Sequence, residues 1–119
     1  MDLKQAIEKH VAWKMKFRAA IDARQTMDQV SIAKDDVCDL GAWLHGPGSA
    51  ECSQCASFDA LVQAHREFHV EAGRIAAAIN AKNYPEAERL LTGAACSAAS
   101  QKAVMAMMSI QREKQTKAA

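Results

Sequence analysis

Two histidines, His65 and His69, lie four positions apart in a chain that contains only four histidines. Side chains at positions i and i+4 of a helix project from the same face, with Cβ atoms about 5–6 Å apart, so the two rings could bind one metal ion. Two ligands by themselves make a weak site. The pair therefore predicts a metal centre only if other segments supply further nitrogen or sulfur donors.

Two further donors occur on other predicted helices. His10 shares a helix face with Trp13 and Phe17, which places its ring on the inward side of an amphipathic helix. Cys38 begins the segment CDLGAWL, a short predicted helix whose apolar residues would pack it against the others. One cysteine and three histidines make four ligands, the number that tetrahedral Zn²⁺ prefers. Four such groups buried without a metal would be hard to satisfy.

Each of these residues also has an ordinary structural interpretation. A single inward-facing histidine is more often a core residue with a satisfied hydrogen bond, and cysteine is among the most buried residue types. A pair such as His65 and His69 can also straddle a surface. A metal centre is favoured because three predicted helices each place nitrogen or sulfur donors toward one interior point.

The elements that would position these donors are all helical. Apolar residues recur at three- and four-residue steps in three long segments, and a short segment carries Cys38. The predicted helices cover approximately residues 2–29, 36–45, 58–80 and 85–115. Gly93 is expected to weaken the last helix, by about 1 kcal/mol relative to alanine, without ending it. The Gly46-Pro47-Gly48 segment is expected to end the short helix.

Length and connections predict the domain organisation. The 119 residues suffice for one hydrophobic core, so we expect a single domain over residues 1–119. Brief connections and the lack of a strand signal predict an all-α fold, a four-helix bundle with three long helices and one short cysteine-bearing helix.

Composition excludes two classes of partner. Fifteen basic and fourteen acidic residues give a formal charge of +1, which does not provide the basic surface of a nucleic-acid-binding protein. No apolar run approaches the roughly 18 residues that a membrane span needs.

Residues 1–10 lack a signal-peptide core, so we expect a cytoplasmic location, where the four cysteines would stay mostly reduced.

The order of these motifs resembles one known family. A histidine, then Cys-x-Leu-Gly-x-Trp-Leu, then His-x-x-Phe-His is similar to the chemoreceptor zinc-binding domain, a family of bacterial cytoplasmic modules. The matching residues lie between positions 7 and 72 and are His10, Trp13, Cys38, Leu40, Gly41, Trp43, Leu44, His65, Phe68 and His69.

The resemblance implies a function. His10, Cys38, His65 and His69 would be the zinc ligands of a helical bundle that pairs into a homodimer. Family members are usually joined to chemoreceptor signalling regions or diguanylate cyclases and report zinc availability or thiol oxidation. This sequence shows no such region, so we expect a stand-alone module acting on a separate partner, or an excised domain.

The expected site is closed, and we therefore predict no enzymatic activity. Four protein ligands leave no coordination position for water or substrate. The metalloprotease pattern H-E-x-x-H needs glutamate after the first histidine, where this chain has Arg66. Three aromatic side chains are expected to form a dry shell around the ligands: Trp13, Trp43 and Phe68.

The remaining donors leave alternatives open. Cys52 and Cys55 form a C-x-x-C motif, so the chain could instead be a small redox protein in which the zinc is purely structural. A plain dimerisation module is a third possibility. We interpret His45 as the C-terminal residue of the short helix and Cys96 as ordinary helix packing. The short helix is also expected to detach if the Cys38 bond is lost.

Overall fold

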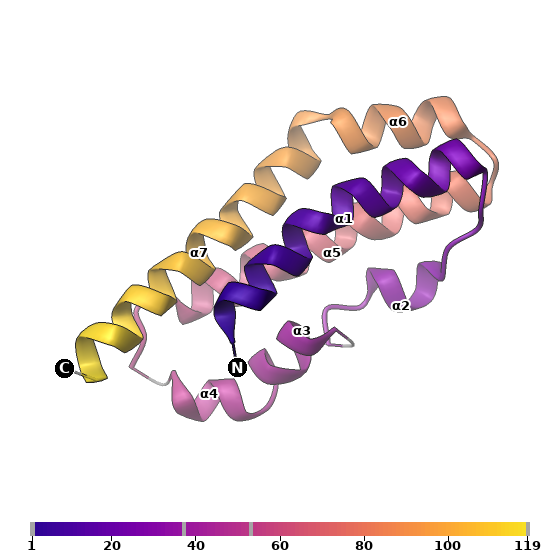
Figure 1. The fold of residues 1–119 in the computed structure, drawn as a ribbon. Helices are drawn as coiled ribbons and strands as arrows, with labels where there is room; N and C mark the ends of the chain where they lie inside the picture. The colour runs from indigo at the N-terminus through magenta and orange to yellow at the C-terminus, as the bar shows by residue number, and fades with distance from the viewer. Residues whose placement is uncertain (1, 37, 53, 119) are drawn as a thin grey trace.

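The computed structural model describes residues 2–36, 38–52 and 54–118, with side chains as far as residue 114. Within these ranges the chain forms seven helices and no strand (Figure 1), which confirms the all-α prediction. Three helices are long, namely α1 (Leu3–Ala23), α5 (Phe58–Asn80) and α7 (Ala94–Ala118). The shorter ones are α2 (Gln29–Ala33), α3 (Asp39–Leu44), α4 (Pro47–Glu51) and α6 (Tyr84–Thr92).

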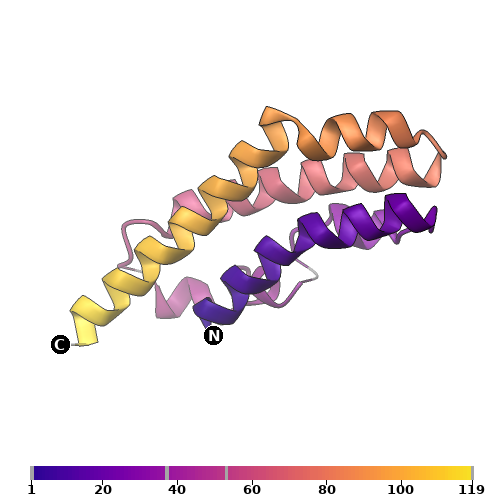
Figure 2. The ribbon, with the colours of Figure 1, turned by 45° about the horizontal axis from the view of Figure 1, so that its top comes forward.

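The long helix α5 organises the fold. It packs against α7, α2 and α6, and α1 lies against α7, α6 and α5. Figures 1 and 2 show α6 and α7 following one another along the same side of α5, with α3 and α4 near the N-terminal end of α1. Among the described residues, none of the helices combines the length and apolar character that a membrane crossing needs.

Among the described residues, the buried apolar side chains form two clusters. One contains Leu3 and Ala6 of α1 with Leu61 of α5, and the other contains Phe17 of α1 with Ile75 of α5. Along both helices the buried histidines fall between the two clusters. The predicted donors on α1 and α5 therefore form a polar layer that interrupts an otherwise apolar core.

The first helix ends earlier than predicted. Arg24 adopts a left-handed conformation with φ 56°, and its N–H bonds to the carbonyls of Ala20 and Ile21, which terminates α1 at Ala23. The first helix was predicted to continue to residue 29. Asp28 instead caps a separate helix, α2, by accepting from the N–H of Ser31.

The prediction of one continuous helix from residue 85 onward is wrong. Gly93 has extended backbone angles, φ −75° and ψ 162°, and separates α6 from α7. Its N–H bonds to the carbonyl of Leu90, and its own carbonyl accepts from the N–H of Ser97. Gly93 thus ends one helix and caps the next. Because Gly93 itself is not helical, the destabilisation expected for a glycine inside a helix does not arise.

The short cysteine-bearing segment forms helix α3, which begins at Asp39, three residues later than predicted, so that Cys38 lies at the capping position and not inside the helix. Val37, within the predicted helix, lies outside the described residues. Gly46 follows the end of α3, but Pro47 then begins α4, because proline fits the first turn of a helix. Gly48 carries no side chain where a Cβ would lie 2.7 Å from the Trp43 ring, so α4 can pack closely on α3.

Candidate metal centre

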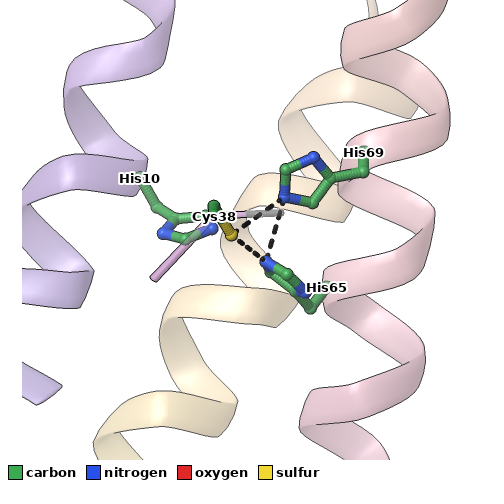
Figure 3. A group of neighbouring side chains, drawn as sticks. All are labelled: His10, Cys38, His65 and His69. Carbon is green, nitrogen blue, oxygen red and sulfur yellow. Dashed lines mark hydrogen bonds between the residues drawn. The ribbon is translucent and has the colours of Figure 1, made fainter. Parts of the chain in front are cut away.

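The structure brings His10, Cys38, His65 and His69 to one point. Figure 3 shows the His10 ring reaching in from α1 and the rings of His65 and His69 from α5, with the Cys38 sulfur between them. One donor atom of each residue lies within 4.8 Å of the donor atoms of the other three. We call these four residues the donor cluster.

The helical spacing of His65 and His69 places both rings on the inner face of α5. Both side chains are buried, their ring centroids lie 4.4 Å apart, and their Nε2 atoms are separated by 3.0 Å. Nδ1 of His69 donates to the backbone carbonyl of Ile32 on α2 at 2.8 Å. This bond directs Nε2 of His69 into the cluster.

Cys38 enters the cluster from the turn that starts α3. Its Sγ lies 3.3 Å from Nε2 of His65 and 3.5 Å from Nε2 of His69. The backbone N–H of Gly41 donates to the same sulfur at 3.3 Å. A Cβ at Gly41 would lie 1.9 Å from the carbonyl oxygen of Asp35, so only glycine lets the preceding loop approach closely enough to position Cys38 here.

His10 completes the cluster from α1. Its Nδ1 donates to the carbonyl of Ala6 at 2.9 Å, which leaves Nε2 as the acceptor nitrogen. That Nε2 atom is buried and has no hydrogen-bond partner among the described residues. The ring centroid lies 5.2 Å from that of His65 and 6.2 Å from that of His69. An unpaired buried acceptor costs about 1–3 kcal/mol, which a bound cation would relieve.

Three of the four donor atoms are spaced as the ligands of a tetrahedral Zn²⁺ ion are, and the donor atom of His10 lies within 4.8 Å of these three. Zinc–nitrogen bonds of about 2.0–2.1 Å and a zinc–sulfur bond of about 2.3 Å place neighbouring ligand atoms roughly 3.3–3.6 Å apart. The separations among Cys38, His65 and His69 run from 3.0 to 3.5 Å. The Nδ1 protons of His10 and His69 are already bound to carbonyls, so their Nε2 lone pairs can face a metal.

Burial sets the protonation of the cluster. It lowers the pKa of all three imidazoles, and that of His65 falls to about 3, with smaller effects from His69, His10 and His45. Burial also raises the pKa of the Cys38 thiol, although backbone N–H groups at the start of α3 oppose this. The histidines are therefore neutral, as metal ligands must be, whereas the thiol needs a cation to ionise readily.

Polar and charged contacts beside the cluster were missed from the sequence. Oδ2 of Asp35 lies 3.4 Å from Nε2 of His45 and 3.8 Å from Nε of Arg66, and Nζ of Lys9 lies 2.8 Å from Oδ2 of Asp39. A signal was present, since residues 9, 39 and 66 each adjoin a donor and carry complementary charges. The pattern of charges predicts these contacts only once it is known which helices pack against one another.

The predicted aromatic shell is only partly observed. Phe68 lies 5.2 Å from the ring of His10 and 5.4 Å from that of His69, measured between centroids. Trp13 instead pairs with Phe17 at 5.5 Å. Trp43 packs at 6.3 Å from Phe58 and donates its indole N–H to Glu51. Phe68 is thus the aromatic residue that shields the donor rings.

The remaining histidine and thiols lie apart from the donor cluster. His45 caps the C-terminal end of α3, as interpreted from the sequence. Cys52 and Cys55 are buried in the apolar cluster near α3 and α4, and burial together with Cys55 raises the pKa of Cys52 to about 11. Because a thiol must ionise to react, this burial disfavours the redox interpretation of the C-x-x-C motif. Cys96 is half-buried on α7.

The helices and their converging nitrogen and sulfur donors define a helical metal-binding domain. A family model described as the chemoreceptor zinc-binding domain matches residues 10–76, a range that contains the whole donor cluster. The match covers more than half of the chain, so the chain belongs to this family and the resemblance seen in the sequence is confirmed. Such domains bind zinc and occur in chemoreceptor-type signalling proteins. Comparisons with curated proteins and with solved structures gave no match.

Proposed function

We propose that the chain binds one Zn²⁺ through Nε2 of His10, His65 and His69 and through Sγ of Cys38. The observation that carries this proposal is the convergence of four donor atoms, from three helices, within 4.8 Å of one another. The unpaired, buried Nε2 of His10 supports it, because that atom has no other role among the described residues. A bound Zn²⁺ would hold α1, α3 and α5 together through strong directional bonds.

The same site supports a sensory rather than a catalytic role. Four protein ligands fill a tetrahedral coordination sphere and leave no position for a substrate. Loss of one sulfur bond, by zinc depletion or by oxidation of Cys38, would release the segment that leads into α3. We therefore propose a non-enzymatic regulatory module that reports zinc availability or thiol oxidation to a chemoreceptor or diguanylate cyclase-type partner. Family membership supports this role and a cytoplasmic location.

We also propose that residues 1–119 form one domain arranged as a four-helix bundle, with α6 and α7 together serving as its fourth helix. The packing of α7 along both α5 and α1 supports this arrangement.

A homodimer is the proposed assembly. Its support is an exposed apolar surface on α1 and α7, formed by Val11, Met15, Met105 and Met108, which we call the α1–α7 apolar surface.

Zinc content of matched variants tests the ligand assignment. We expect one zinc per chain in the natural sequence and an affinity at least about a hundredfold weaker in Cys38→Ala and His69→Gln. Cys96→Ala and His45→Gln are the matched controls, since each removes the same side chain outside the cluster, and both should keep the zinc. Circular dichroism establishes that each variant is folded. Equal zinc content in Cys38→Ala and Cys96→Ala would disprove the proposed site.

A further inference from the structure

The donor cluster is open on one side. Three of its members are buried, whereas Cys38 is partly exposed. The exposed side faces a groove of about 580 Å³ between α1 and the start of α3, and both His10 and Cys38 line it. Figures 1 and 2 show the first turns of α1 beside α3. We call this feature the α1–α3 groove; its volume suits a small molecule.

Two other approaches to the cluster are covered by protein. The carbonyl of Ile32 closes the far side of His69 through its hydrogen bond to Nδ1. Phe68 covers the rings of His10 and His69 from within α5. A second groove, between α1 and α7, is lined by His10 but not by Cys38. The α1–α3 groove, which Cys38 itself lines, is therefore the direct route to the sulfur while the helices stay folded.

An ion pair bridges the two walls of this groove. Lys9 on α1 directly precedes His10, and Asp39 on α3 directly follows Cys38; Nζ and Oδ2 lie 2.8 Å apart. Both side chains are largely exposed and line the groove. Exposed pairs of this kind are weak, so the bridge can open without unfolding of either helix.

We propose that the α1–α3 groove is the entry route by which small thiols and small nitrogen- or sulfur-donor chelators reach Cys38, and that the Lys9–Asp39 pair gates it. As a route for metal exchange, this inference rests on the proposed zinc site. As a route to the thiol, it depends only on the described groove. Access through the groove needs no detachment of α3, which distinguishes it from release of the whole segment.

Alkylation of the metal-free chain by iodoacetamide measures access to Cys38 directly. The sulfur forms a bond to the reagent's CH₂ carbon, iodide leaves, and the thiol proton passes to solvent. Peptide mass spectrometry separates the rate at Cys38 from the rates at Cys52, Cys55 and Cys96. Because the reagent is uncharged and small, its rate reports entry into the groove.

Removing either partner of the ion pair should open the gate. We expect Lys9→Ala and Asp39→Ala each to raise the alkylation rate of Cys38 about two- to fivefold, the range that a weak surface pair allows. A purely electrostatic effect on the thiol would instead change the two rates in opposite directions, because the two variants remove opposite charges. Opposite changes would overturn the gate.

Narrowing the groove should have the reverse effect. Gln5 is exposed and lines the α1–α3 groove, whereas the neighbouring Lys4 is exposed on another face of α1. We expect Gln5→Phe to slow alkylation of Cys38 at least about threefold and the matched control Lys4→Phe to leave it unchanged. Equal rates in these two variants would overturn the entry route.

The zinc-loaded chain separates failure of this inference from failure of the proposed function. Zinc transfer to 1,10-phenanthroline, an uncharged nitrogen-donor chelator, should rank the variants in the same order as alkylation does. If zinc binds but neither rate follows the groove variants, and both instead follow hydrogen exchange of residues 35–46, the segment detaches and the groove inference is wrong. If no zinc binds but alkylation follows the groove variants, the groove stands and the zinc proposal fails.

Discussion

At the scale of single residues, the three imidazoles are held differently. His10 and His69 each donate Nδ1–H to a backbone carbonyl, of Ala6 and Ile32 respectively, which fixes both the tautomer and the ring orientation. Nδ1 of His65 is buried and has no hydrogen-bond partner among the described residues. Packing alone orients His65, and its ring is the one whose charged form burial disfavours most clearly.

The metal-free chain should become less stable in acid because of these rings. Their pKa values are lowered in the folded state, so the unfolded chain takes up protons first as the pH falls below about 6.5. The free energy of unfolding should then decrease by up to about 1.4 kcal/mol per pH unit for each ring, and for His65 this continues until the pH approaches its folded value of about 3.

Urea unfolding of the metal-free chain between pH 8 and pH 5 measures this effect. A folded His65→Asn variant should show a shallower decrease, because one titrating group is gone. A free energy of unfolding that rises on acidification, or the same slope in both chains, would contradict the assignment of buried neutral imidazoles.

At the scale of elements, α2 and α3 are short helices whose positions depend on close backbone contacts. A Cβ on Gly73 of α5 would lie 2.8 Å from the Cβ of Ala33 on α2. Because glycine has no Cβ, α2 can lie close to α5, where the Ile32 carbonyl accepts from His69. The loop before α3 lies against Gly41 in the same way. Neither contact follows from helical periodicity, and α2 was accordingly absent from the sequence prediction.

Gly41→Ala tests the importance of this contact for the site. The new Cβ would lie 1.9 Å from a backbone oxygen, which cannot rotate away as a side chain can. We expect a loss of about 2–3 kcal/mol in the free energy of unfolding and weaker zinc binding, because the turn that carries Cys38 must shift.

Gly93→Ala is the matched control. Gly93 has a negative φ, and its added Cβ would come no closer than 3.0 Å to the nearest carbonyl oxygen. We expect a change within about 1 kcal/mol and unchanged zinc affinity. Equal effects of the two substitutions on zinc affinity would show that the close approach at Gly41 does not position Cys38.

At the scale of the whole molecule, the α1–α7 apolar surface contains four of the six large hydrophobic side chains that are exposed among the described residues. Met15 is 76% exposed and Met105 is 59% exposed, while Val11 and Met105 line one groove of about 340 Å³ between the two helices. His10 lines this groove as well, so a partner bound there would contact the back of the metal site.

Charged substitutions on this surface test the proposed homodimer. We expect Met15→Glu and Met105→Glu each to raise the dimer dissociation constant at least about tenfold, because a buried unpaired charge is costly. Val30→Glu on α2 is the control, since Val30 is also exposed but lies outside the α1–α7 apolar surface. Analytical ultracentrifugation measures the change. A monomeric natural chain, or equal effects of all three variants, would exclude a homodimer through this surface.

Local patterns in the sequence determined much of this protein. Helical periodicity over α1, α5 and most of α7 predicts their existence, because each repeat depends only on residues three or four positions apart. The same spacing pairs His65 with His69, and the Cys-x-Leu-Gly-x-Trp-Leu segment identifies the family. Gly93 shows the limit of such patterns, because an extended conformation at one residue divides a helix whose apolar pattern continues.

Only the tertiary structure decided how the donors meet. Cys38 lies 27 residues from His65, and its sulfur reaches that ring because the loop at Asp35 can lie against Gly41. The Ile32 carbonyl behind His69 and the Lys9–Asp39 bridge across the groove likewise join segments distant in sequence. Such contacts depend on packing between helices, which short-range periodicity does not specify. The sequence therefore predicted the donor residues but not the α1–α3 groove beside Cys38.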